Sequence, residues 1–190
     1  MDTIPNELLL LILELVEEGQ VRSVMRVCKR WRQLMLDVYR RKKLPKLSIA
    51  CFISTVPTLQ WACENGFFWD ENTCSNVALK GHLDVLQWAR DNGCPWDEQT
   101  CVEAVRGEYF NILKWAREHG CPWDEDTCEY AAKEGHLEIL QWVRAQDPPC
   151  PWNEETCAAA ADEGHFNILI WAREHGCPWD KDTCKYIAKS

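Results

Sequence analysis

The cysteines are the side chains with the clearest chemical potential, and the chain has 12 of them. Eight recur in pairs with six residues between the two members: Cys94/Cys101, Cys121/Cys128, Cys150/Cys157 and Cys177/Cys184. Structural zinc favours cysteines about two to four residues apart and four ligands per site, whereas each pair offers two. We therefore expect these cysteines to be small buried hydrophobic residues. A metal ion shared between neighbouring pairs and thiol oxidation are the alternatives.

Histidines form a second recurring set, since His82, His136 and His165 each follow a glycine. Catalysis would need a nucleophile or acid within reach of such a histidine, and a pocket around it. The pattern supplies neither, so we expect no enzyme activity, no catalytic residue, no metal and no cofactor.

Ten of the 11 tryptophans repeat at intervals of 27 or 29 residues. The leading set is Trp61, Trp88, Trp115, Trp142 and Trp171, and the trailing set is Trp69, Trp96, Trp123, Trp152 and Trp179. A fixed period of about 20–50 residues marks stacked repeats, which usually bind other molecules. We expect the tryptophans to form the core between repeats, with a base-stacking ladder as the alternative.

The unit at 123–148 shows how one repeat folds. Asp124 caps a first helix that runs to about Glu134, and Gly135 suits a left-handed turn. A second helix then runs from about His136 to Gln146, before a Gly-Cys-Pro-Trp loop. The same pattern predicts four two-helix units, at 70–93, 97–120, 124–147 and 153–176. A single second helix is expected before them at 56–65, and an unpartnered first helix that frays is expected at 180–190. The fourth connection, at 147–150, is expected to form a bulged loop.

Arginines recur at one place in the second helix, at Arg90, Arg117, Arg144 and Arg173. Because acidic caps lie nearby, we expect a column of ion pairs along the stack, each contributing about 0–1 kcal/mol. A recognition stripe for acidic ligands is the alternative.

Net charge divides the chain into two parts. Residues 1–50 carry 10 Lys and Arg against 6 Asp and Glu, whereas residues 51–190 carry 11 against 24. The acidic array would repel a phosphate backbone, so we expect no nucleic-acid partner. Acidic Asp2 and Glu7 precede the apolar start, and no run of about 18 apolar residues follows. We expect an intracellular, reduced protein, cytoplasmic or nuclear, with no membrane partner.

The tract Thr127-Cys128-x-x-Ala131-Ala132-x-x-Gly135-His136-Leu137 resembles the ankyrin repeat. It recurs at 73–83 and 156–166, and at 100–110 the order Gly107-Glu108-Tyr109 displaces the glycine. The units are about six residues shorter than the family's 33. They look like the tryptophan-rich variant found in protists and giant viruses. The resemblance implies that the histidines brace the turns by hydrogen bonds and that the first helices line a concave face.

The first helices also carry side chains that vary between otherwise similar units. Varied residues on a repeated frame suit specific protein recognition, with an ordinary solvated face as the alternative. The candidate target-binding residues are Asn76, Leu79, Glu103, Arg106, Asp126, Tyr130, Lys133, Asp162 and Tyr186.

The N-terminal segment predicts a small helical hairpin that needs a partner for stability. Its sequence, Pro-x-Glu-Leu-Leu-x-x-Ile-Leu followed by Val-Cys-Lys-x-Trp-Arg-x-Leu, resembles an F-box, with Ile4 before the proline and Gly19-Gln20-Val21 between the helices. An F-box docks onto a Skp-type adaptor of a cullin-RING ubiquitin ligase. The adaptor-binding residues implied by the resemblance are Ile4, Pro5, Leu8, Leu9, Ile12, Leu13, Val27, Cys28, Trp31 and Leu34.

We therefore expect an all-α chain: an F-box-like helical module followed by an ankyrin-like repeat solenoid. The expected boundaries are 1–40 for the module, 41–55 for a basic connector with a degenerate first repeat, and 56–190 for the array. The expected function is that of an SCF-type substrate-recognition subunit, which is a monomer outside the complex. The alternative is a stand-alone protein-interaction scaffold whose N-terminal hairpin only caps the array.

Overall fold

The computed structural model describes residues 53–64, 68–180 and 183. The chain divides into two compact units, Met1–Phe52 and Ile53–Ser190, and every described residue belongs to the second. All regular elements of the described residues are α-helices, without a β-strand among them, which confirms the all-α fold class. The helices are α4 (Val56–Glu64), α5 (Glu71–Leu79), α6 (Leu83–Asp91), α7 (Glu98–Arg106), α8 (Phe110–Glu118), α9 (Glu125–Lys133), α10 (Leu137–Arg144), α11 (Glu154–Asp162) and α12 (Phe166–Glu174).

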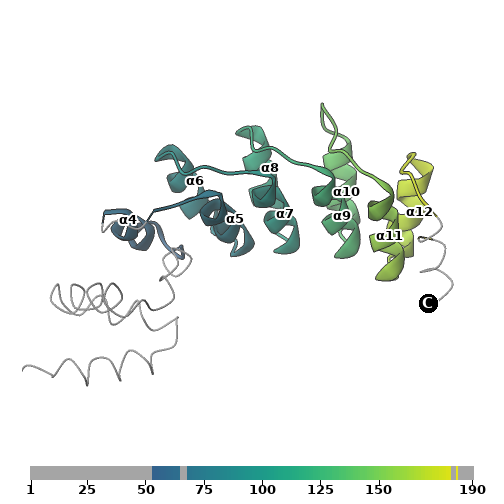
Figure 1. The fold of residues 1–190 in the computed structure, drawn as a ribbon, viewed down its shortest axis with the longest axis horizontal. Coiled ribbons are helices and arrows are strands. Elements are labelled where there is room, and N and C mark those ends of the chain that lie inside the picture. The colour runs from purple at the N-terminus through teal and green to yellow at the C-terminus, as the bar shows by residue number, and fades with distance from the viewer. Residues whose placement is uncertain (1–52, 65–67, 181–182, 184–190) are drawn as a thin grey trace, which may run out of the picture. The chain divides into compact units, whose positions relative to one another are not determined.

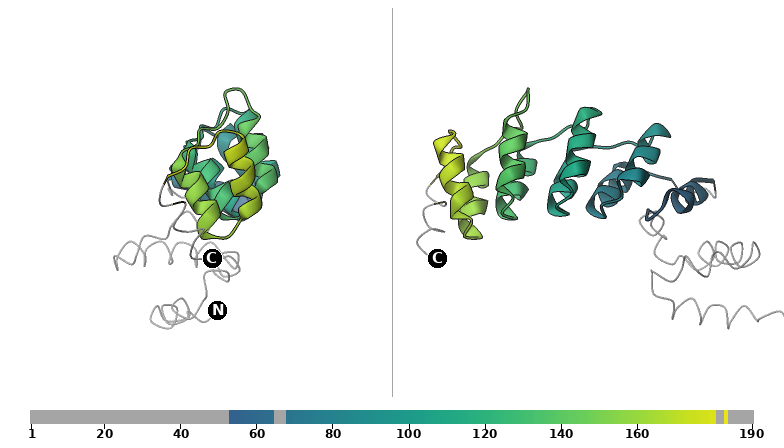
Figure 2. Two further views of the ribbon diagram at one scale, coloured as in Figure 1. Left: turned by 90° about the vertical axis from the view of Figure 1, so that its right-hand side faces the viewer. Right: turned by 180° about the vertical axis from the view of Figure 1, so that it is seen from behind.

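The array is built from helix pairs stacked in two rows (Figure 1). We call α5, α7, α9 and α11 the A helices, and α4, α6, α8, α10 and α12 the B helices. Each A helix packs against the next A helix and against the B helix that follows it in the chain. Helix α4 packs against α6, so the single helix predicted at 56–65 starts the B row. The left view of Figure 2 looks along the two rows.

Small residues allow the A helices to approach one another closely. Their buried faces consist largely of Cys, Ala and Val, such as Cys128, Ala131 and Ala132 of α9. The B helices bury larger side chains, such as Ile112 and Leu113 of α8. One helix pair cannot cover this apolar surface alone, so the units must stack.

Each A helix begins at the predicted cap residue. The backbone of Asp70, Asp97, Asp124 and Asn153 is extended there. The Asn153 side chain accepts a hydrogen bond from the Glu155 N–H at 3.0 Å. The same cap begins a fifth A position, because the Thr183 N–H donates to Asp180 Oδ1 at 3.0 Å. The predicted fraying of 180–190 falls largely outside the described residues.

The A-to-B turn needs one residue in the left-handed region. Gly81, Gly135 and Gly164 adopt φ values of 76°, 83° and 74°. In the second unit Glu108 takes this conformation, with φ 62°, while Gly107 ends α7 with φ −83°. The displaced glycine seen in the sequence therefore leaves a side-chain-bearing residue in a conformation that costs about 1–2 kcal/mol.

The connection after α10 bulges, as the sequence predicts, and it rises above the neighbouring loops in Figure 1. Helix α10 has 8 residues where the other B helices have 9. The Cys150 N–H still donates to Val143 O at 3.0 Å, as the Cys121 N–H donates to Ala116 O at 2.9 Å. The extra residues, which include Asp147 and Pro148 with a cis bond between them, therefore lie between Val143 and Cys150, whose hydrogen bond is the same as in the other units.

Candidate target-binding surface

The candidate target-binding residues lie on the four A helices, in one register. Their neighbours one position away on each helix form the buried face, so these side chains point partly or fully outward. Asn76, Leu79, Glu103, Asp126 and Tyr130 are half-buried, and Arg106, Lys133 and Asp162 are exposed. Tyr186 lies outside the described residues. Whether these residues bind a target stays a prediction.

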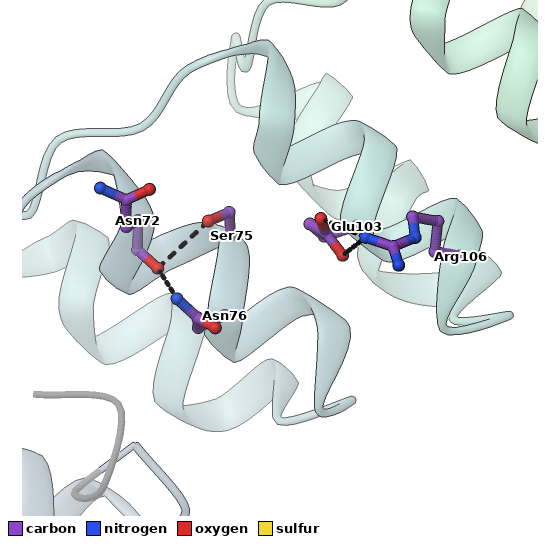
Figure 3. Close-up of polar contacts among 5 residues, drawn as sticks. All are labelled: Asn72, Ser75, Asn76, Glu103 and Arg106. Atoms are coloured by element: carbon purple, nitrogen blue, oxygen red, sulfur yellow. Dashed lines mark hydrogen bonds and ion pairs between the residues drawn. The ribbon is translucent and has the colours of Figure 1, made fainter. Parts of the chain in front are cut away.

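At α5 the candidate surface is polar and held by its own helix. Asn72 O accepts hydrogen bonds from Asn76 Nδ2 at 2.6 Å and from Ser75 Oγ at 3.1 Å (Figure 3). Asn72 Nδ2 in turn donates to Asp70 Oδ2 at 3.2 Å. These local bonds use part of the donor capacity of the amides, so this end of the surface offers little to a partner.

The centre of the surface is a cluster that joins α7 to α9, which we call the Arg106–Tyr130 cluster. Arg106 Nη1 donates to both oxygens of Glu103, at 2.8 and 3.1 Å (Figure 3). The Arg106 guanidinium lies 5.5 Å from the Tyr130 ring centroid, and Lys133 Nζ lies 5.8 Å from the same centroid. Such cation–π contacts contribute about 0.5–1 kcal/mol at exposed sites. Tyrosine and arginine are among the residue types most often found in binding hot spots.

Carboxylates of the A helices act on one another near the helix N-termini. Burial raises the pKa of Asp124, and Asp126, Glu98 and Glu125 raise it further. Burial also raises the pKa of Glu129, with Asp126 and Glu155 adding to the effect. Carboxylates from α7, α9 and α11 are therefore close enough to raise one another's pKa.

The predicted column of arginine ion pairs is wrong. None of the four arginines pairs with a described carboxylate; each lies over the tryptophan of the loop that follows it. The distances from guanidinium carbon to ring centroid are 4.0 Å for Arg90 and Trp96, 4.2 Å for Arg117 and Trp123, 3.9 Å for Arg144 and Trp152, and 3.4 Å for Arg173 and Trp179. Arg117 Nη1 also donates to Cys121 O at 3.1 Å, and Arg90 and Arg144 bond to the Cys94 and Cys150 carbonyls. The arginines therefore brace the loops, and the alternative of a recognition stripe for acidic ligands stays untested.

The described tryptophan side chains meet edge to face and are half-buried, apart from the exposed Trp179. Each loop tryptophan meets the B-helix tryptophan of its own unit. The ring centroids lie 6.0 Å apart for Trp69 and Trp88, 5.9 Å for Trp96 and Trp115, 6.3 Å for Trp123 and Trp142, and 6.1 Å for Trp152 and Trp171. Because each arginine comes from the preceding unit, arginine and tryptophans together link one unit to the next.

The turn histidines act by packing. The three predicted histidines cap the B helices α6, α10 and α12, and no hydrogen bond from their side chains is found within the described residues. His136 Nε2 is buried without a partner there. A Cβ added to Gly135 would lie 2.8 Å from the His165 ring. His165 thus covers the turn glycine of the unit before it, as Tyr109 covers Gly81, and the expected hydrogen-bond bracing is not found among the described residues.

The described cysteines meet in other pairs than the sequence spacing suggests, and Cys184 lies outside the described residues. In the array, Cys94, Cys121, Cys150 and Cys177 lie beside the cysteine of the A helix in their own unit, namely Cys74, Cys101, Cys128 and Cys157. All nine described cysteines are free, and these eight are buried. No group of three or more metal-ligating side chains was found in the described part of the chain.

A hollow of about 620 Å³ lies between α8 and α10 and was not anticipated from the sequence. Lys114 stands beside it, with its Nζ 3.8 Å from the Phe110 ring centroid. The hollow is lined by Lys114, Arg117, Glu118, Gly120, Trp142, Gln146 and Asp147. Lys114 stands where the other units have Gln87, Gln141 and Ile170, and Asp147 belongs to the longer loop. Those two departures are the signal in the sequence that could have located it.

The predicted adaptor-binding residues Ile4, Pro5, Leu8, Leu9, Ile12, Leu13, Val27, Cys28, Trp31 and Leu34 all lie outside the described residues. In the described part, no helix has the length and apolar character needed to cross a membrane. A family model for F-box-like domains matches residues 1–44. The comparison with curated proteins found no match.

Proposed function

We propose that this chain is a substrate-recognition subunit of an SCF-type cullin-RING ubiquitin ligase. The observation that carries the proposal is the F-box-like match at residues 1–44, joined to a helical repeat array in one chain. F-box domains bind Skp-type adaptors, which makes such an adaptor the first partner. The adaptor contacts are the ten apolar residues from Ile4 to Leu34 named above.

The second partner in this proposal is a protein that binds the A helices. The frame of these helices repeats, whereas their outward side chains differ from unit to unit, which suits recognition of one particular target. The Arg106–Tyr130 cluster would be the centre of the contact, since it presents a held aromatic ring with two cations. The shared Thr-Cys, Ala-Ala and Gly-His pattern supports an ankyrin-like repeat, shortened and rich in tryptophan, of the type known from protists and giant viruses.

In this function the chain does no chemistry itself. It would act in the cytoplasm or nucleus by holding the target beside the ubiquitin-charged enzyme, so that its contribution is proximity. Outside the complex it would be a monomer without a nucleic-acid or membrane partner.

Adaptor binding is tested by co-purifying the full-length chain with a Skp-type adaptor, beside the double variant Leu8→Ala/Trp31→Ala. We expect the double variant to lose the adaptor while far-UV circular dichroism shows the array still folded. Tyr130→Ala is the matched control, because it changes the array and should keep adaptor binding. If the wild-type chain binds no adaptor, or the double variant binds it equally well, the F-box function is wrong.

A stand-alone scaffold, with the N-terminal hairpin serving only as a cap on the array, is the second candidate. The need of such a short hairpin for a partner favours it. It predicts that no adaptor co-purifies and that Leu8→Ala/Trp31→Ala lowers the melting temperature of the array. The same two measurements therefore separate the candidates.

A further inference from the structure

Each of the four units holds two cysteine thiols side by side, one from the A helix and one from the loop after the B helix. We call Cys74/Cys94, Cys101/Cys121, Cys128/Cys150 and Cys157/Cys177 the unit thiol pairs. The loop cysteine donates from Sγ to the carbonyl oxygen of the residue that caps the A helix. The Sγ-to-oxygen distances are 3.7 Å for Cys94 and Asp70, 3.4 Å for Cys121 and Asp97, 3.2 Å for Cys150 and Asp124, and 3.4 Å for Cys177 and Asn153.

Helix geometry then brings the second cysteine to the same place. The carbonyl of a helix cap points along the axis toward the residue four positions later, and in every unit that residue is the A-helix cysteine. In the third unit a second bond closes the contact, because Cys128 Sγ donates to Cys150 O at 3.9 Å. The four-fold repetition makes this juxtaposition a property of the unit.

We propose that the unit thiol pairs are sites of intramolecular disulfide formation, and that Cys157/Cys177 is the first pair to close. This inference does not depend on the proposed ligase function. The loop cysteines Cys94, Cys121 and Cys150 have no exposed surface, whereas Cys177 keeps 5% of its surface exposed. An oxidant in solution therefore reaches the fourth pair most easily.

The electrostatics of the fourth pair favour the same order. The hydrogen bond from the Cys177 thiol lowers the pKa of Cys157 below its ordinary value, and Arg173 adds to the effect against burial. In all four pairs, the fourth included, a thiol hydrogen bond and burial raise the pKa of the loop cysteine, namely Cys94, Cys121, Cys150 and Cys177. Since the thiolate is the nucleophile, Cys157 is the residue best prepared to attack.

The oxidant can be a small azo compound such as diamide. The Cys177 sulfur, which keeps 5% of its residue's surface exposed, adds to the N=N bond, and its proton passes to nitrogen. The Cys157 thiolate then attacks the Cys177 sulfur, the S–S bond forms, the S–N bond breaks, and the hydrazine leaves with the second proton. Two thiols are oxidised and one diazene is reduced, so atoms and electrons balance.

The test treats the native full-length chain with diamide, quenches samples with an alkylating reagent, and maps disulfides by peptide mass spectrometry. We expect disulfides within the unit thiol pairs, with Cys157–Cys177 forming faster than Cys101–Cys121, because the fourth pair has the accessible sulfur and the lowered thiol pKa. Bonds between sequence neighbours such as Cys94–Cys101, equal rates for all pairs, or no disulfide with diamide in excess would overturn the proposal.

Two matched variants complete the test. Cys177→Ser should remove the fast phase and leave the slower pairs unchanged, whereas Cys121→Ser should leave the fast phase intact. If Cys121→Ser abolished the fast phase while circular dichroism showed a folded array, the assignment of that phase to the fourth unit would be wrong. The mapping on the wild-type chain decides the pairing even if a variant does not fold.

Discussion

The A-to-B turns allow the stacking of the units to be tested by adding a single Cβ atom with glycine-to-alanine substitutions. We predict that Gly135→Ala destabilises the array more than Gly164→Ala, although both glycines are left-handed, with φ 83° and 74°. The two positions share the same place in their units and differ in what covers them. A Cβ at Gly135 meets three His165 ring atoms at 2.8–3.1 Å, whereas a Cβ at Gly164 meets nothing within 4 Å.

The expected magnitudes follow from these distances. Gly164→Ala carries only the cost of a left-handed alanine, about 1–2 kcal/mol. Gly135→Ala adds the displacement of the His165 ring, an overpacking cost of about 1–3 kcal/mol, for a total of about 2–5 kcal/mol. The reverse change, Glu108→Gly, removes the left-handed cost but makes the unfolded chain more flexible, so we expect a gain of about 0.5–1 kcal/mol.

Urea unfolding followed by circular dichroism measures all three variants against the wild-type chain. Equal destabilisation by Gly135→Ala and Gly164→Ala would show that His165 does not hold the turn before it, and the packing argument would fail. A loss of stability in Glu108→Gly would contradict the left-handed conformation of Glu108. Gly176→Ala serves as a second control, because its φ is 84° and nothing lies within 4 Å of its added Cβ.

Three further predictions concern the loops, the tryptophans and the carboxylates. Arg117→Ala should lower the free energy of unfolding by about 1–2 kcal/mol, because it removes a ring contact and a carbonyl hydrogen bond. The loss should be equal at about 0.1 M and 1 M NaCl, since no ion pair that salt would screen is removed. Urea midpoints at both salt concentrations check this. Trp142→Ala, which loses edge contacts to both Trp123 and Phe110, should cost about 3–5 kcal/mol, and Trp179→Ala, 44% exposed, clearly less in the same assay. Glu129→Gln should raise the melting temperature at pH 7, because burial and neighbouring carboxylates disfavour the charged form of Glu129 in the folded chain. The gain should vanish as the pH falls below 4.5, where wild-type Glu129 is protonated in both the folded and the unfolded chain. A constant gain across pH would contradict the raised pKa.

Local signals placed the elements of the array well. The cap residues from Asp70 to Asp180 marked the A helices, and glycines marked the turns in every full unit except the second, where Glu108 takes the left-handed position. Helix ends agree within two residues because capping and left-handed turns are decided by neighbouring residues. The candidate binding residues could be assigned to one face for the same reason, since helical periodicity alone decides which side chains share a face.

Contacts between residues distant along the chain were predicted less well. Arg117 has acidic residues nearby in sequence, yet the structure places the Trp123 ring and the Cys121 carbonyl against it. His165 packs on a glycine of the preceding unit, and Lys114 borders a hollow made by two units. These contacts depend on how far one unit is displaced from the next, which the sequence pattern does not contain.

By itself the sequence determined the all-α class, the repeat period, the helix boundaries and the F-box-like character of residues 1–44, because propensity, capping and periodicity act over a few neighbouring residues. Only the tertiary structure decided which cysteines are partners. Cys94 and Cys101 are close in sequence, but the return of the B helix along its A helix brings Cys94 to Cys74 instead. The partner of a side chain is set by the packing of two helices, and that packing is a property of the whole stack.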